Sequence, residues 1–544
     1  MQSNLAVAEE LLRISAYLEH PPGPSCPNTA CEHHGVAMAT APGNYVRYGT
    51  NSHGTPRYRC NECRKVFSVS NRSTNGQRVT HTNRDIFEHL VNTVPIRRII
   101  KLLKITPGVF YRRLDFIWRQ CQLFAGERER GLLERKDLGK LCLSIDRQAL
   151  MVNWSNRKDR RNTLLWSIAT ADLATGYVLA ANLNYDPALT AETVAEDAKR
   201  YGDFKHPRAF RRYARVWLPD DFDGAVPVYD TKKRKIADAA FEERLDLAIE
   251  STYEAALARE DIEAGAGPAK TIRTPVRGMQ VHEQVSMVAH LQFVARLLRN
   301  AEKVRVYMDQ ESGIRAAFMA AYQDRVTART ADAWYVQVLK EGTVGEKKQA
   351  VKLAHQRLAQ AQIANPHLGE DDVIVLLARE EMTRMAAHGK WKDKWLRHPL
   401  PDMREPEKKV CWLTDIDALP VPGPEDDADA ITQKKAQAED ILNHAARLYL
   451  KGSLRAVDKF FMQIRRGLTM AERGVVTAAS DGRWFGKNAY DPANLVKLVE
   501  IFRVYYNYCE VGEDKQTPAM RLGLAKGPVA SEDILYFVRA SSGR

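Results

Sequence analysis

The sequence lacks the features of a membrane-bound or secreted protein. No apolar run approaches the roughly eighteen residues that a membrane-spanning helix needs. The N-terminal stretch, residues 1–20, is typical of a short amphipathic helix and shows no cleavable signal pattern. The chain also lacks internal repeats and long low-complexity tracts. With 544 residues it is long enough for several domains, so we expect a soluble, multidomain, cytoplasmic protein with no membrane partner.

Cysteine is scarce as well, with eight residues in the chain. Four of them form two close pairs, Cys26 with Cys31 and Cys60 with Cys63, in a stretch that has too few aliphatic residues for a core. Such pairs can offer four thiolates to one tetrahedral zinc ion, which would replace the missing core. A reducing compartment argues against disulfides. The histidines that could replace one cysteine as a ligand are His33, His34 and His53. The other four cysteines are expected in the core: Cys121, Cys142, Cys411 and Cys509.

Positive charge is concentrated in one segment. Between Arg57 and Arg119 there are fourteen Lys or Arg against four Asp or Glu, a net +10 within a chain total of +13. Local positive charge of this kind indicates contacts with a phosphate backbone, although a merely cationic surface is the alternative. Four of these cations surround the second cysteine pair: Arg57, Arg59, Arg64 and Lys65.

Two helices with a tight turn between them are predicted directly after the cysteine-rich stretch. Apolar residues recur at helical spacing over 96–103, and Thr106-Pro107 is a helix start with an N-cap and a proline. The second helix would expose Tyr111, Arg112 and Arg113 to the major groove of double-stranded DNA. Its inward side would hold Val109, Leu114 and Ile117. The alternative is a helical hairpin without DNA contact.

Each of two predicted strands carries an acidic residue. The strand over 141–154 contains Asp146 near its centre, and two further antiparallel strands follow over 163–182. A helix over 282–300 then leads to a strand that ends at Asp309. Because a strand delivered by such a crossover runs parallel to its neighbour, Asp309 can lie beside Asp146. Adjacent carboxylates repel unless cations bind them, and Mg²⁺ suits such oxygen ligands.

A two-metal site for phosphoryl transfer needs a third carboxylate. The predicted helix near the C-terminus offers Asp458 at the border of its apolar stripe, with Arg465 two turns further along the same face. We therefore select Asp458. The other candidate carboxylates are Glu472, followed by Glu311 and Asp172.

In these motifs the chain resembles bacterial insertion-sequence transposases that have a zinc ribbon and an integrase-like core of the ribonuclease H-like superfamily. The resemblance rests on CPNTAC, YRCNECRKVF, the SID and YMD strands, and the stretch from VDKFFMQIRRGLTMAERG to TPAMRLGLAKG. It implies a structural Zn²⁺, and Mg²⁺ ions, replaceable by Mn²⁺, held by Asp146, Asp309 and a third acid. It further implies binding of the element's end DNA and of target DNA, cleavage with strand transfer, and a homodimer or higher oligomer on nucleoid DNA. Asp458 departs from the family's usual Glu.

The expected fold class is multidomain α/β, in which a zinc ribbon and a helix-turn-helix precede a mixed sheet flanked by helices. The competing interpretations are a zinc-ribbon DNA-binding regulator, a ribonuclease H-like nuclease without strand transfer, and a tyrosine recombinase using His444, Arg447 and Tyr490. The expected segments are an N-terminal helix (1–22), the zinc ribbon (23–75), the helix-turn-helix (80–125), a core formed by 138–185, 285–340 and 440–480, insertions at 186–284 and 341–439, of which the second is helical, and a C-terminal region (481–544).

Overall fold

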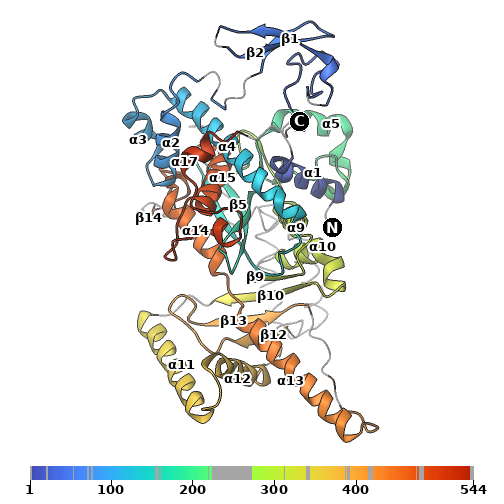
Figure 1. Cartoon of the computed structure of the whole chain (residues 1–544), viewed down its shortest axis with the longest axis vertical. Coiled ribbons are helices and arrows are strands. Elements are labelled where there is room, and N and C mark those ends of the chain that lie inside the picture. Colours follow the sequence, from blue (N-terminus) through green and yellow to red (C-terminus); the bar gives the residue numbers. More distant parts are fainter. Residues whose placement is uncertain are drawn as a thin grey trace.

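The computed structural model shows an elongated molecule with a sheet at its centre (Figure 1). The strands β1 and β2 lie at one end, and the helices α11–α13 lie at the other. Within the described residues, no helix combines the length and the apolar character required to cross a bilayer. The structure describes residues 3–19, 23–38, 40–52, 54–69, 73–74, 77–153, 159, 161–218, 220–222, 272–310, 313–338, 343–385, 387–388, 393–414, 420, 422–472, 475–476 and 483–538.

A mixed sheet organises the described chain, with strand order β11-β12-β13-β10-β9-β4-β5-β6. Strands β4, β5 and β6 are consecutive and antiparallel, and β9 then pairs parallel with β4 and β10 parallel with β9. The sheet thus has the three antiparallel strands and the parallel neighbour that the sequence predicts. The bounds are β4 (Lys140–Val152), β5 (Thr163–Asp172), β6 (Val178–Leu183), β9 (Lys303–Asp309) and β10 (Ala331–Val338).

The two faces of the sheet carry different helices. The crossover helix α9 (Glu283–Leu297) lies on one face, where Glu283 forms an ion pair with Arg147 of β4. The imidazole of His290 on the same helix is buried and hydrogen-bonds Thr170 of β5 at 2.7 Å. Side chains alternate along a strand, so the residues of β4 on either side of Arg147 point to the opposite face. The helices α13 (Ala428–Leu450) and α14 (Arg455–Gly467) cover that face.

The far edge of the sheet corrects one expectation. The segment 341–439 was predicted to be helical, and it does contain α11 (Val344–Ala364) and α12 (Glu370–Thr383). It also adds three strands, and β13 pairs antiparallel with β10. These strands have at most five residues each, too few for a clear period-2 pattern. Their bounds are β11 (Ala387–His388), β12 (Asp393–Arg397) and β13 (Lys408–Trp412).

One hydrophobic core joins the N-terminal helices, the sheet and the C-terminal helices. The long helix α4 (Pro107–Glu134) begins at the predicted N-cap, where the Thr106 hydroxyl accepts from the Val109 amide. Its inward residues Leu114 and Ile117 are fully buried. The other elements are α1 (Asn4–Ser15), α2 (Thr82–Val91), α3 (Ile96–Leu102), α5 (Ala191–Tyr201), α10 (Ile314–Thr327), α15 (Pro492–Tyr508), α16 (Pro518–Arg521), α17 (Ser531–Leu535), β1 (Tyr45–Thr50), β2 (Pro56–Cys60), β3 (Val66–Ser68), β7 (Tyr185–Asp186), β8 (Met279–Gln280), β14 (Val475–Val476) and β15 (Arg483–Trp484).

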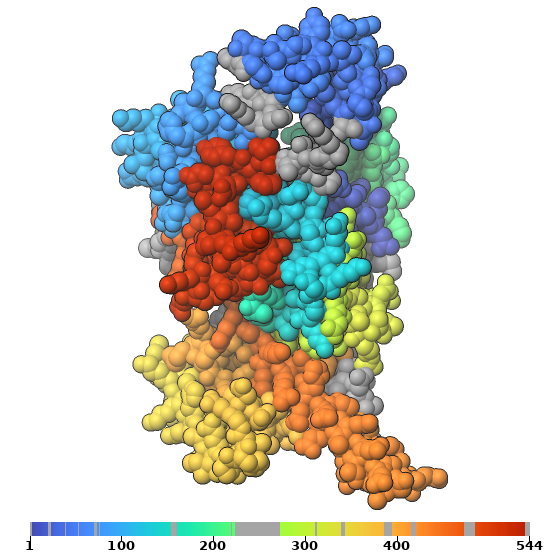
Figure 2. Space-filling view, viewed as in Figure 1, coloured from blue at the N-terminus to red at the C-terminus, as the bar shows by residue number. Residues whose placement is uncertain are grey.

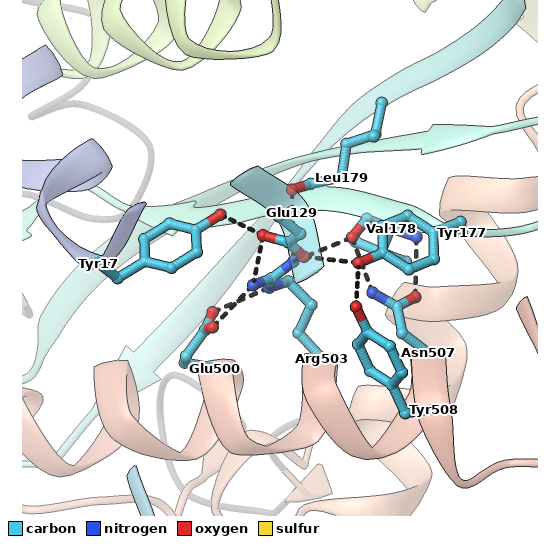
Figure 3. Close-up of polar contacts among 9 residues, drawn as sticks. All are labelled: Tyr17, Glu129, Tyr177, Val178, Leu179, Glu500, Arg503, Asn507 and Tyr508. Carbon is cyan, nitrogen blue, oxygen red and sulfur yellow. Dashed lines mark hydrogen bonds and ion pairs between the residues drawn. The ribbon is translucent and has the colours of Figure 1, made fainter. Parts of the chain in front are cut away.

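A buried ion cluster connects these parts (Figure 3). The guanidinium of Arg503 on α15 donates to Glu129 of α4 at 2.6 Å and to Glu500 at 2.8 Å. It also donates to the backbone carbonyls of Val178 and Leu179 in β6. Arg503 and Glu129 have side-chain exposures of 2% and 0%, and burial raises the pKa of Glu500. Two tyrosine hydroxyls complete the shell of the Glu129 carboxylate: Tyr17 at 2.5 Å and Tyr177 at 2.6 Å.

We predict that Arg503→Met lowers the free energy of unfolding by about 3–5 kcal/mol, because it leaves Glu129 charged and unpaired in the core. Arg84→Met is the matched control. Arg84 pairs with Glu88 and Glu532 on the surface, with a side-chain exposure of 53%, so its replacement should leave the free energy of unfolding nearly unchanged. Urea unfolding of the full chain measures both. Equal effects of the two substitutions would contradict the structural role assigned to Arg503.

Candidate functional site

The four paired cysteines meet in the small sheet formed by β1, β2 and β3. Their sulfur atoms all lie within 4.8 Å of one another, although the two pairs are far apart in sequence. The Sγ atoms of Cys26 and Cys63 are 3.4 Å apart, and those of Cys31 and Cys60 are 3.7 Å apart. Four thiolates around tetrahedral zinc have sulfur–sulfur separations of about 3.8 Å. The cluster can therefore hold a metal ion such as zinc.

Hydrogen bonds around the cluster orient the two segments that carry the cysteine pairs. The Tyr45 hydroxyl accepts from the amide of Cys26 and donates to the carbonyl of Val36, and its ring packs edge-on against Phe67. Of the histidines considered as ligands, His33 lies 3.4 Å from the Cys60 sulfur, and His34 bonds the carbonyl of Cys26. Both imidazoles thus sit outside the ring of four sulfurs. The third, His53, lies outside the described residues.

The thiols of the cluster differ in acidity. Burial raises the pKa of Cys26 to about 12, whereas the hydrogen bond from the Lys65 backbone lowers the pKa of Cys63 to about 6. A bound cation favours the thiolate form of all four, since it replaces sulfur–sulfur repulsion by attraction. All eight cysteines of the chain are free of disulfides, so the four remain available as ligands.

The cations predicted around this centre divide into two groups. Arg57 and Arg59 lie on β2 with their guanidinium groups 5.8 and 5.4 Å from the ring centre of Tyr48. Arg64 and Lys65 are exposed in the turn between β2 and β3. The turn and the strand therefore present positive charge next to the cysteine cluster.

A basic groove of about 1000 Å³ lies at the turn before α4. No Asp or Glu of the described chain lines it, which makes the groove suited to an anionic ligand. Of the residues predicted for the exposed side of the helix, Tyr111 and Arg112 are exposed, and Arg112 lines the groove. Arg113 is half-buried instead, because its guanidinium donates to the Val79 carbonyl at 3.0 Å. Three further cationic side chains line the groove and were not predicted from the sequence: Arg78, Lys104 and Arg119.

The first two candidate carboxylates lie side by side on adjacent strands. In the parallel pairing of β4 with β9, Ser144 is opposite Tyr307 and Ile145 is opposite Met308. The next residues in this register are Asp146 and Asp309, both half-buried. Partners in a parallel ladder point to the same face. Tyr307 points toward α13, where its hydroxyl donates to the Leu448 carbonyl, so both carboxylates are on the face that α13 and α14 cover.

Two hydrogen bonds attach α14 to β4 along this face. The Val457 amide donates to the Ser144 hydroxyl at 3.2 Å, and Arg465 donates to the side chain of Gln148 at 3.0 Å. Because Asp146 lies between Ser144 and Gln148 on the strand, the helix runs over it, with the half-buried Asp458 between the two attachment points. Sequence reasoning missed Ser144 and Gln148, whose alternation with Asp146 was the available signal.

The three carboxylates do not form as close a group as the four cysteines. In the described part of the chain, the cysteines are the one group of three or more potential ligands whose atoms lie within 4.8 Å of each other. Among the lower-ranked acids, Asp172 caps its own turn by accepting from Thr175 at 2.7 Å, and Glu472 pairs with Lys487 at 3.0 Å. Glu311 lies outside the described residues.

The residues of the recombinase alternative lie on different elements. Arg447, on α13 with His444, pairs with Asp372 of α12. Tyr490 precedes α15 and lines a hollow with Arg161 and Arg273. No protein-family model and no curated protein sequence matches the chain.

We predict that Cys60→Ser abolishes stoichiometric metal binding by the purified protein and makes residues 23–69 sensitive to protease, because three ligands cannot replace the missing core. Cys509→Ser is the control, since that thiol lies at the end of α15 away from the cluster. Metal analysis and limited proteolysis measure the outcome. Full retention of metal in Cys60→Ser would contradict the assignment.

Proposed function

We propose that the protein is a DNA transposase that cuts and joins DNA at a carboxylate face formed by Asp146, Asp309 and Asp458. The observation that carries the proposal is the side-by-side placement of Asp146 and Asp309 in register on parallel strands, beneath the helix that bears Asp458. Three half-buried acids on one face form a set of oxygen ligands that suits a divalent cation, which supports a functional reason for their placement.

The carboxylate oxygens suit a hard divalent cation, and Arg465 supplies a positive charge on the same helix for the DNA backbone. When bound at these residues, Mg²⁺ would activate the nucleophile and stabilise the leaving oxygen. In the first reaction the oxygen of water bonds to phosphorus while the P–O3′ bond breaks, which leaves a 3′-hydroxyl and a 5′-phosphate. In strand transfer the oxygen of that 3′-hydroxyl bonds to a phosphorus of target DNA while the P–O3′ bond of the target breaks, which leaves a 3′-hydroxyl on the target strand. Joining two ends in this way calls for a homodimer or larger assembly.

The N-terminal part of the chain, which comprises the cysteine-rich sheet and the start of α4, would bind double-stranded end DNA. Supporting this are the basic groove at the start of α4, the exposed Arg112 beside it, and the exposed Arg64 and Lys65 of the cysteine-rich sheet. Phosphate contacts from these cations would fix the orientation of the duplex, and the exposed side of α4 would contact the bases.

We predict that Asp146→Ala, Asp309→Ala and Asp458→Ala each reduce Mg²⁺-dependent cleavage and joining by a factor of about a thousand, because each removes a metal ligand. The substrate is labelled DNA from the regions that flank the coding sequence. Reactions with Ca²⁺ instead of Mg²⁺ show the metal requirement, and product sizes separate cleavage from joining.

Glu472→Ala is the matched control, because Glu472 pairs with Lys487 near the end of the same helical segment. It should retain activity. If activity is lost in Glu472→Ala and kept in Asp458→Ala, the third carboxylate of the proposed site is Glu472 and not Asp458. Cleavage without joining would favour a ribonuclease H-like nuclease, and DNA binding without cleavage by the unmodified protein would favour a zinc-ribbon regulator.

A separate prediction concerns the basic groove. Arg112→Ala should weaken duplex binding and reduce the slope of log K against log salt by about 0.9, the effect of one lost phosphate contact. Lys435→Ala, an exposed cation on α13, is the control and should leave the slope unchanged. Fluorescence anisotropy across a salt series measures both. An unchanged slope in Arg112→Ala would place the DNA elsewhere.

A further inference from the structure

A second basic surface lies in the predicted insertion 186–284. Between Lys199 and Arg212 there are six Lys or Arg and a single acid, Asp203. The segment covers the end of α5 and two short 3₁₀ turns, η3 (Asp203–Lys205) and η4 (Arg208–Phe210). Figure 1 places α5 toward the same end of the molecule as β1 and β2. In Figure 2, this part of the chain is coloured green and lies below the blue surface of the cysteine-rich sheet.

Three aromatic rings of this segment face the solvent. Phe210 has 76% of its surface exposed, Tyr201 has 48% and Phe204 has 40%. The exposed part of each ring gains little from folding, and three partly exposed aromatic rings within ten residues are more than scattered surface apolar residues explain. We call these rings together with the exposed Arg200, Lys205 and Arg212 the aromatic–arginine patch.

The rings alternate with cations. The Arg212 guanidinium lies 4.4 Å from the ring centre of Tyr201, and that of Arg200 lies 5.7 Å from the same ring. Arg211 lies 5.9 Å from the ring centre of Phe204. These contacts bring the end of α5 and the end of η4 together, so the patch is one surface and not two separate loops.

The single acid of the segment does not neutralise the patch. Asp203 has 3% exposure, and its carboxylate accepts from the backbone amides of Arg212 and Tyr213 at 3.1 Å each. These two hydrogen bonds hold the backbone at Arg212 and Tyr213 against the buried Asp203, below the aromatic–arginine patch. Gly202, at φ 69°, ends α5 in the left-handed conformation that this reversal needs.

Two other cations of the segment are engaged by neighbouring side chains. Arg211 forms an ion pair with Asp221, and Arg208 lies over the ring of Trp217. Within the described part of the chain, Arg200, Lys205 and Arg212 make no ion pair with a carboxylate, and all three are exposed. A ligand that fits such a surface carries flat apolar rings and regularly spaced negative charges.

We propose that the aromatic–arginine patch binds single-stranded nucleic acid. Unpaired bases stack on Tyr201, Phe204 and Phe210, while Arg200, Lys205 and Arg212 contact the phosphates. A duplex hides the faces of its bases, so the rings select unpaired strands. The inference rests on the proposed function only in naming DNA as the nucleic acid in use; the chemistry of the patch would also accept RNA.

The test compares the affinities of the full chain for labelled oligothymidylate, oligouridylate and a duplex of the same length. The variant is Tyr201→Ala with Phe210→Ala. The matched control is Leu353→Ala with Ile363→Ala, which removes two exposed apolar side chains from α11, at the other end of the molecule in Figure 1. Both variants should unfold at the temperature of the unmodified protein, because all four side chains are exposed.

The patch variant should bind oligothymidylate about fivefold to a hundredfold more weakly for each lost stacking contact, and its affinity for the duplex should not change. The control variant should bind all three oligonucleotides as the unmodified protein does. Arg212→Ala should reduce the salt slope for oligothymidylate by about 0.7. Tighter binding of oligouridylate than of oligothymidylate would identify RNA as the ligand.

Three results would overturn the proposal: unchanged oligothymidylate binding by the patch variant, an equal loss for duplex and single strand, or a shift from dimer to monomer in light scattering, which would make the patch a protein contact. Measuring cleavage in parallel separates the two proposals. The proposal for the patch is supported if the patch variant loses single-strand binding and Asp146→Ala retains single-strand binding. This holds whatever the outcome of the cleavage assay.

Discussion

The ion pair between Arg503 and Glu129 is the contact on which the arrangement of the molecule depends. Glu129 belongs to the long helix α4 and Arg503 to α15, and the same guanidinium reaches the backbone of β6 (Figure 3). Tyr17 brings the N-terminal helical segment into the same cluster. Since charges buried this deeply are tolerated only when fully paired, these elements must assemble together. The helix that starts at the basic groove is thereby fixed to the edge of the central sheet.

The parts of the fold that could be predicted from the sequence are those with a local pattern. The strands β4, β5 and β6 alternate clearly, and the turn at Asp172 between two of them has its own capping residues. The crossover helix α9 leaves one topology for β9, which brings Asp309 into register beside Asp146. The cysteine cluster was predictable for a similar reason, because paired spacing is a property of the sequence itself.

The other parts depend on contacts between distant residues. Glu129 and Arg503 are 374 positions apart, and neither is distinguishable from a surface charge by its neighbours. The strands β12 and β13 are too short to show a period, so their place beside β10 follows from tertiary packing. Arg113 was expected at the DNA, yet a carbonyl at Val79 holds it against the chain. The patch around Phe210 escaped notice because a net charge per segment does not show which rings are exposed.

The helix α4 extends without interruption for 28 residues, a length of about 42 Å, and contributes side chains to both the basic groove and the ion cluster. In the proposed function α4 would fix the distance between the bound duplex and the sheet, because a continuous helix is stiff where a linker is flexible. A rod also transmits rotation. Each residue added to or removed from α4 between Arg112 and Glu129 would turn one end against the other by about 100°. In the proposed function, the rotation of the bound duplex relative to the carboxylates would therefore depend on the number of residues in this one helix.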